Sequence, residues 1–232
     1  MKKHLLYWLL PALLIIIYMI IYFFDLFGVS YIIAPNINRE FGLLENTQLI
    51  IIIGIMIIAT QGFFTSSNKF KKLIMLLAFF ISVFLFLEEI DYGDHFVKYF
   101  SNEIPQKITE SYKNKHFRNI HNNGKLTEYF KLTAYIIFGM LLMIYPYLLK
   151  KFKIKNPYIL WFKPSGYLVY TLLVMIFINQ LALFLDKHFK AAHIHALNSN
   201  VSEFEEVFIY LIMFLYLREL KNKTLLQKKT IE

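Results

Sequence analysis

The sequence predicts an all-α integral membrane protein, a single membrane domain built as a bundle of six transmembrane helices. Hydrophobic residues make up 57% of the 232 residues, and they gather in long blocks separated by charged segments. The first block, Leu5–Phe24, contains no charged residue and is long enough to cross a hydrocarbon layer of about 30 Å. Continuous apolar runs lack the alternation of a membrane β-barrel, so helices are the structure that satisfies the backbone inside lipid.

Five further apolar blocks complete this prediction. The first span is expected to be retained rather than cleaved as a signal peptide, because its apolar run exceeds the usual length of about 7–15 residues. We expect an outer helical cap between the third and fourth spans and a solvated basic cytoplasmic tail after the sixth. The predicted spans cover about residues 5–25, 47–65, 72–92, 132–149, 166–186 and 203–218, the cap residues 94–131 and the tail residues 219–232.

Two helix starts are predicted from residues that favour capping. Asn46 or Thr47 would cap the second span, and the dipole of that helix would favour the nearby Glu45. Ser202, followed three residues later by Glu205, has the spacing of a capping box at the start of the sixth span.

The distribution of charge predicts the orientation of the bundle. Lys and Arg gather before the first span, between the second and third, between the fourth and fifth, and after the sixth. These four segments hold 15 of the 25 basic residues but only 2 of the 16 acids. Because positive residues favour cytoplasmic loops, both termini are predicted to be cytoplasmic. Six of the seven histidines and 14 of the acids then belong to the outer side.

Composition excludes several classes of function. The chain has no cysteine, which excludes disulfides, thiolate metal sites and a catalytic cysteine. The formal net charge of +9 follows the predicted membrane topology, so we expect the lipid bilayer, and no nucleic acid, as partner. The sequence also contains neither a Gly-x-Ser-x-Gly nucleophile elbow nor a glycine-rich phosphate loop.

The stretch Phe84–Phe96 is the most informative part of the sequence for function. A long apolar helix runs here into Glu88, Glu89, Asp91 and His95. A carboxylate inside a span costs about 2.5–3.5 kcal/mol on insertion scales, so such residues need a functional or structural reason. If the helix continues, three of these four side chains, at i, i+3 and i+7, share one face.

Other segments add histidines and acids on the same predicted side. Histidines and carboxylates from separate helices suit a divalent metal such as Zn, Mn, Fe or Mg, while carboxylates alone can act as general acid and base. Glu203 and Glu206 would also share a face with Tyr210. The candidate catalytic residues are Glu88, Glu89, Asp91 and Glu206, and the candidate metal ligands are His95, His121, His188, His193 and His195.

With these residues the chain resembles a group of uncharacterised bacterial polytopic membrane proteins. In that group a Glu-Glu-Ile-Ser-Trp-Gly-Gln element ends the third span, where this chain has Glu88-Glu-Ile-Asp-Tyr-Gly-Asp94. Three shorter elements of the group have counterparts in Arg39-Glu-Phe-Gly42 with Glu45, in His121-Asn122 and in Glu205-Glu206. The resemblance implies a multi-pass protein of a bacterial cell membrane and a site that includes Glu88 and Glu89.

Three functions remain open at this stage. One is a metal- or carboxylate-dependent hydrolase or transferase that acts on a lipid or lipid-linked substrate at the outer face. A similarity to the superfamily that includes alkaline ceramidases provides a chemical precedent, although those enzymes have seven spans and a His-x-x-x-His pair. The second is a small transport or channel component. The third is a membrane-anchored subunit of an envelope or defence complex with a structural polar cluster; homo-oligomers are compatible with all three.

Overall fold

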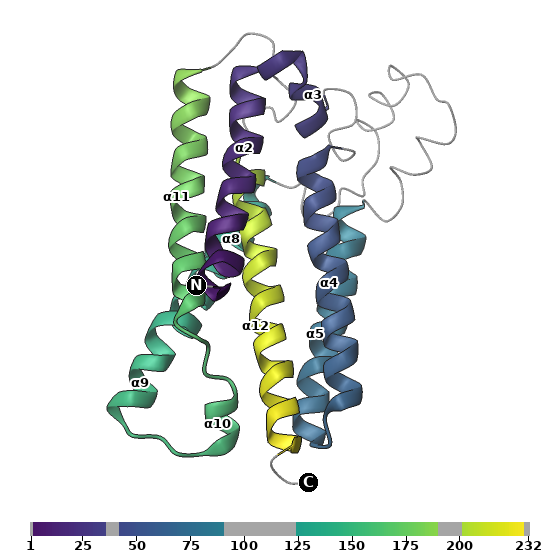
Figure 1. The fold of residues 1–232 in the computed structure, drawn as a ribbon, viewed down its shortest axis with the longest axis vertical. Coiled ribbons are helices and arrows are strands. Elements are labelled where there is room, and N and C mark those ends of the chain that lie inside the picture. The colour runs from purple at the N-terminus through teal and green to yellow at the C-terminus, as the bar shows by residue number, and fades with distance from the viewer. Residues whose placement is uncertain (1, 36–41, 91–123, 190–200, 230–232) are drawn as a thin grey trace, which may run out of the picture.

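The fold is a bundle of long helices that run along one common direction (Figure 1). The computed structural model describes residues 2–35, 42–90, 124–189 and 201–229. Within these ranges the regular structure is entirely helical, with no strand. Five helices of the described chain are long and apolar enough to cross a membrane, which is the length and composition of the helices of a multi-pass membrane protein.

The first membrane helix contains a π-helical turn directly before a proline. After α1 (Lys2–His4), the π-helical η1 (Leu5–Leu9) leads into α2 (Leu10–Phe24), with Pro11 in the first turn of α2. Proline has no N–H and its ring crowds the carbonyl one turn earlier, so the chain widens into a π-turn before it. Pro146 repeats this arrangement between η5 (Met140–Ile144) and α9 (Tyr145–Lys151).

A helical hairpin follows the first helix. The 3-10 turn η2 (Leu26–Gly28) and the short α3 (Ser30–Ile33) connect α2 to α4 (Leu43–Thr65), and α5 (Lys69–Glu89) returns beside α4. Asn68 caps α5, because its side-chain oxygen accepts hydrogen bonds from the backbone N–H groups of Phe70 at 3.0 Å and Lys71 at 3.2 Å.

The second half of the chain supplies the remaining helices. The run formed by α8 (Gly124–Gly139), η5 and α9 is followed by the short α10 (Pro157–Trp161), by α11 (Tyr167–His188) and by α12 (Glu203–Lys229). α12 lies in the middle of the bundle, packed on α4 along one side and on α11 along another. The helix α5 packs on α4 and reaches the site described below from there.

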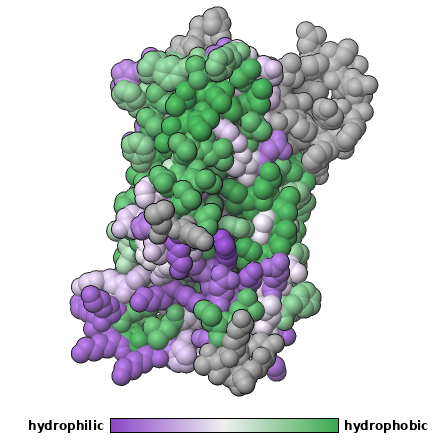
Figure 2. Space-filling view, viewed as in Figure 1, coloured by the Kyte–Doolittle hydropathy of each residue, from purple (hydrophilic) through white to green (hydrophobic). Residues whose placement is uncertain are grey.

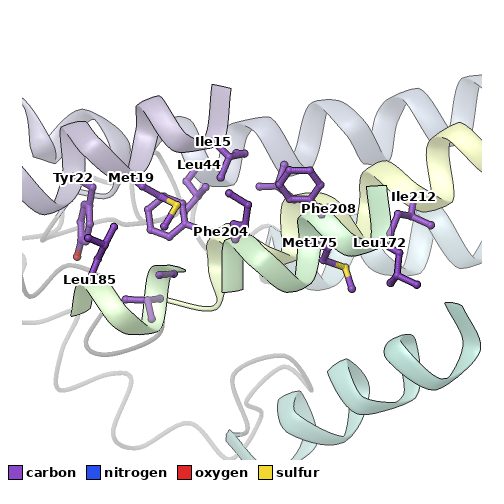
Figure 3. Packing of buried hydrophobic residues seen from close by; sticks show 14 of the residues in the cluster. Ile15, Met19, Tyr22, Leu44, Leu172, Met175, Leu185, Phe204, Phe208 and Ile212 are labelled. Atoms are coloured by element: carbon purple, nitrogen blue, oxygen red, sulfur yellow. The ribbon is translucent and has the colours of Figure 1, made fainter. Parts of the chain in front are cut away.

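The hydrophobic core forms around the amino half of α12. Phe204 and Phe208 are fully buried there, and Figure 3 shows them among side chains from α2, α4 and α11. The neighbouring contributions include Met19 from α2, Leu44 from α4 and Met175 from α11. Burying a large apolar side chain contributes about 1.5–3 kcal/mol in water, and inside lipid the same close packing supplies dispersion contacts.

The outside of the bundle is apolar where lipid would contact it. The described spans expose many large hydrophobic side chains, among them Ile50, Phe80, Ile137 and Phe177. Hydrophobic residues cover the upper part of the face in Figure 2, whereas polar residues gather in its lower part. An apolar belt of this extent is typical of a surface that faces hydrocarbon rather than water.

Several predicted boundaries differ from the observed ones. The second span begins at Leu43 after the N-cap residue Gly42, so the prediction that Asn46 or Thr47 caps it was wrong. Instead, Thr47 Oγ1 and Asn46 Nδ2 donate to backbone oxygens one turn earlier. A Cβ at position 42 would come within 2.2 Å of the Ile33 carbonyl oxygen, so this helix start requires the absence of a side chain.

The predicted cap and tail also change at their ends. Residues 124–131, assigned to the cap, form the start of α8, while the rest of the cap lies outside the described residues. Residues 219–229, predicted as a solvated tail, continue α12 as a packed helix. Periodicity could not reveal this continuation, because the packing surface of α12 comes from a distant segment of the chain.

That segment is the connection between α9 and α11, which binds the carboxyl half of α12. Trp161 is buried, and its Nε1 donates to the Leu220 carbonyl at 3.2 Å and to Thr224 Oγ1 at 3.1 Å. Ser165 donates from its backbone N–H and its hydroxyl to the two carboxylate oxygens of Glu219, at 2.9 and 2.5 Å. Lys223 Nζ donates to the Trp161 carbonyl at 3.0 Å, and burial lowers the pKa of this lysine.

Candidate functional site

The amino end of α12 places three carboxylates inside the bundle. α12 begins at Glu203, directly after Ser202, as the sequence predicted, and the Ser202 carbonyl accepts hydrogen bonds from the N–H groups of Glu205 and Glu206. The side chains of Glu203, Glu205 and Glu206 are all buried, with at most 4% exposure. They are buried because α12 starts below the upper ends of α2 and α11 in Figure 1.

α4 approaches the first of these acids. Gln48, which is fully buried, donates from Nε2 to the backbone oxygen of Glu203 at 3.2 Å and to its Oε2 at 3.3 Å. Glu45 lies one turn earlier on α4 and is also buried. The spacing i, i+3 places Glu45 and Gln48 on the same side of α4, toward α12.

α5 contributes the two glutamates that end it. Glu88 and Glu89 are both buried, with 5% and 7% exposure. The Tyr210 hydroxyl of α12 donates a hydrogen bond to Glu89 Oε1. Glu206 and Glu203 also lie within electrostatic range of Tyr210, so this hydroxyl is surrounded by carboxylates from two helices. We refer to the six buried acids at this end of the bundle as the carboxylate cluster: Glu45, Glu88, Glu89, Glu203, Glu205 and Glu206.

α8 brings a lysine and a tyrosine to the other side of α12. Lys131 Nζ forms an ion pair with Glu206 Oε1 at 2.5 Å and donates to Ser202 Oγ. One turn along α8, the Tyr135 hydroxyl is within hydrogen-bonding range of Glu205, and Asn179 of α11 completes this contact. The cluster therefore joins α12 to four other helices.

The arrangement can bind and transfer protons. Several carboxylates held close together in a low-dielectric interior cannot all ionise freely, because each charge disfavours the next. Buried charges are retained in proteins where they are paired and hydrogen-bonded, as Glu206 is with Lys131. Neighbouring acids in different environments, one bonded to a tyrosine and another to a lysine, are the usual arrangement for an acid and a base of separate roles.

Part of the predicted site is assembled here and part of it lies elsewhere. Glu89 at the end of α5 and Glu206 near the start of α12 are brought together around Tyr210, and Glu88 is buried next to Glu89 in the chain. His188 is exposed at the end of α11, where its ring lies 4.4 Å from that of Phe184, centroid to centroid. The other candidates lie outside the described residues; they are Asp91, His95, His121, His193 and His195.

The described part of the chain contains no group of three or more histidine or acidic side chains arranged to hold a metal ion. The metal ligands of the prediction are mostly outside the described ranges, so the prediction of a metal site stays a prediction. The carboxylate cluster and its neighbours supply carboxylate, amide, phenol and ammonium groups, which are groups that general acid–base chemistry can use.

Sequence reasoning did not identify four members of this site. The pattern of the sequence singled out none of Gln48, Lys131 and Tyr135, and it gave Tyr210 only as a residue on the same face as two acids. The one available signal was the i, i+4 spacing of Lys131 and Tyr135 ahead of an apolar run, which places both on one helix face.

Comparison of the chain with known protein families, with curated proteins and with solved structures gave no match.

Proposed function

We propose that this protein is a six-span protein of a cell membrane with both termini in the cytoplasm, and that the carboxylate cluster is its acid–base site. In this proposal α12 is the sixth span. Its apolar run, Val207–Leu217, is short, but α12 is enclosed by α4 and α11 and needs little lipid-facing surface. The acids at its start and the lysines at its end then lie at opposite sides of the membrane.

The reaction class that this site supports best is a carboxylate-dependent hydrolase or transferase acting on a lipid or lipid-linked substrate at the outer face. The observation that carries it is the hydrogen bond from Tyr210 to Glu89 with Glu206 nearby, because it brings proton acceptors and a proton donor together in the bundle. Ionisable residues inside a membrane protein are costly and usually mark a functional site. The resemblance to bacterial polytopic proteins, whose matching elements include Glu88 and Glu89, supports the same location.

The test is turnover of lipid substrates by the purified protein in lipid nanodiscs. Headgroup, acyl and glycosyl transfer would be followed by mass spectrometry for wild type, Glu89→Gln and Glu206→Gln. Glu219→Gln is the matched control, because Glu219 is also a buried glutamate of α12 but binds Ser165 at the other end. We expect the two cluster variants to lose turnover by about 100-fold or more, as for loss of a general acid or base, while the control retains it.

The second candidate is a membrane-anchored subunit with a structural polar cluster. It is favoured by the way the cluster ties α12 to α4, α5, α8 and α11 through Gln48, Glu89, Lys131 and Tyr135. Under this alternative, Glu89→Gln and Glu206→Gln would lower thermal stability without changing any turnover, and wild type would turn over none of the lipids. The same experiment therefore separates the two candidates.

A further inference from the structure

The hydrogen bonds of the Gln48 amide use only one of its two polar atoms and leave the other without a hydrogen bond among the described residues. Nε2 donates to two oxygens of Glu203, at 3.2 and 3.3 Å. The reverse orientation would place the amide oxygen against those same oxygens, so the hydrogen bonds fix the amide. Oε1 is then a fully buried acceptor, and none of the described residues donates a hydrogen bond to it.

An acceptor in this state needs a donor, which a bound ligand or a water molecule can supply. A buried polar atom without a hydrogen bond costs about 1–3 kcal/mol, and native structures seldom keep one without a reason. Glu45 lies on the same side of α4 as Gln48, and Glu203 accepts hydrogen bonds from Gln48 Nε2. The oxygen Oε1 of Gln48 therefore lies near carboxylates. The group that fits must donate hydrogen bonds and carry positive charge.

We propose that the carboxylate cluster binds a primary ammonium group, with Gln48 Oε1, Glu45 and Glu203 as its acceptors. An ammonium offers three N–H donors on one small cation, which matches an amide oxygen between two carboxylates. A metal ion fits less well, since no three acids among the described residues have the arrangement for one. The inference rests on the proposed function and gives its substrate a chemical class, a lipid or small molecule with an amino group.

The ammonium can belong to a lipid headgroup or to a free amine, and the experiment has an arm for each. The first arm measures thermal unfolding of the purified protein in a detergent without amino groups, with added ethylammonium or tetramethylammonium. The second arm compares nanodiscs of phosphatidylethanolamine with nanodiscs of phosphatidylcholine. Both pairs keep the positive charge, but the methylated member has no N–H to donate.

We expect the N–H-bearing member of at least one pair to raise the unfolding temperature, because ligands that bind only the folded state stabilise it. A response to ethylammonium identifies a free amine, and a response confined to phosphatidylethanolamine identifies a headgroup. In Gln48→Leu the apparent affinity should fall at least tenfold. Gln61→Leu is the matched control, because Gln61 lies on the same helix and its side chain bonds to Lys221, at 2.8 Å, far from Gln48 along α4.

Equal responses to both members of each pair would overturn the inference, as would no response at all, since a bridging water would then satisfy Gln48. If Gln48→Leu fails to fold, the two comparisons on the wild-type protein still show whether an ammonium with N–H groups binds. The outcome is separable from the proposed function, because binding is measured without turnover. Lipid turnover without ammonium preference rejects only the inference, and ammonium binding without turnover rejects only the enzyme.

Discussion

The Tyr210 hydroxyl donates a hydrogen bond to Glu89 Oε1 and so joins α12 to α5 across 121 residues of sequence. α5 packs mainly on α4, so this bond is a direct link from the end of α5 to the central helix. Because both partners are buried, neither can exchange the bond for water at low cost. We therefore expect the position of Glu89, and with it the geometry of the carboxylate cluster, to depend on this tyrosine.

Replacement of the tyrosine by phenylalanine tests that dependence. Tyr210→Phe removes the donor while keeping the ring, and it leaves Glu89 Oε1 buried with one bond fewer. We expect the free energy of unfolding to fall by about 1–3 kcal/mol, measured by denaturant unfolding in detergent micelles. Tyr170→Phe, at an exposed site, is the control and should change little. Equal effects of the two replacements would mean that the Tyr210 bond contributes no net stability.

The ion pair between Lys131 and Glu206 should contribute to the free energy of unfolding. Lys131 retains 15% side-chain exposure, so its removal should cost roughly 3 kcal/mol, the lower end of the range for breaking a buried pair. Lys131→Met should therefore destabilise the protein strongly, and Glu206→Gln in the same chain should recover part of the loss. A double-mutant cycle of unfolding free energies measures the coupling. Additive effects would show that the two charges do not interact in the folded protein.

The helical architecture was predictable because it follows from length and polarity alone. Leu5–Phe24 and Tyr167–His188 were recognised almost to their ends, since a long uncharged run inside lipid has only the helix available. The bounds of α12 were harder to predict from the sequence, because its charged ends shorten its apolar run. Its packing onto the α9–α11 connection is also a tertiary property. Its extension to Lys229 depends on Trp161, which is distant in sequence.

The candidate site was predictable only in its most costly residues. The sequence identifies Glu88, Glu89 and Glu206, because a carboxylate at the end of an apolar run costs free energy when the run enters a membrane. Gln48 and Lys131 carry no such signal, since amides and lysines are ordinary at helix ends. Their roles arise from which helices become neighbours, and a single sequence does not contain the pairing of Gln48 with Glu203.

Two glycine replacements should have opposite effects, because Gly42 lies at the contact between α3 and α4 whereas Gly139 has open space beside it. A Cβ added at Gly42 would lie 2.2 Å from the Ile33 carbonyl oxygen, a backbone atom that cannot turn aside. Gly42→Ala should therefore displace α3 from the start of α4 and lower the unfolding temperature. Gly139→Ala has no atom within 4 Å of the new Cβ and should stabilise its helix by about 0.5–1 kcal/mol. Thermal unfolding of both variants checks the pair, and a stable Gly42→Ala protein would contradict the close approach.

The absence of cysteine allows the proposed orientation to be tested without background labelling. Phe27 is 95% exposed in the turn after α2, and Lys155 is exposed in the connection between α9 and α10. In intact cells a membrane-impermeant maleimide should label Phe27→Cys but not Lys155→Cys, because basic loops stay in the cytoplasm. After the membrane is opened, both variants should react, which controls for thiol access. Labelling of Lys155→Cys in intact cells would reverse the orientation and place the carboxylate cluster on the cytoplasmic side.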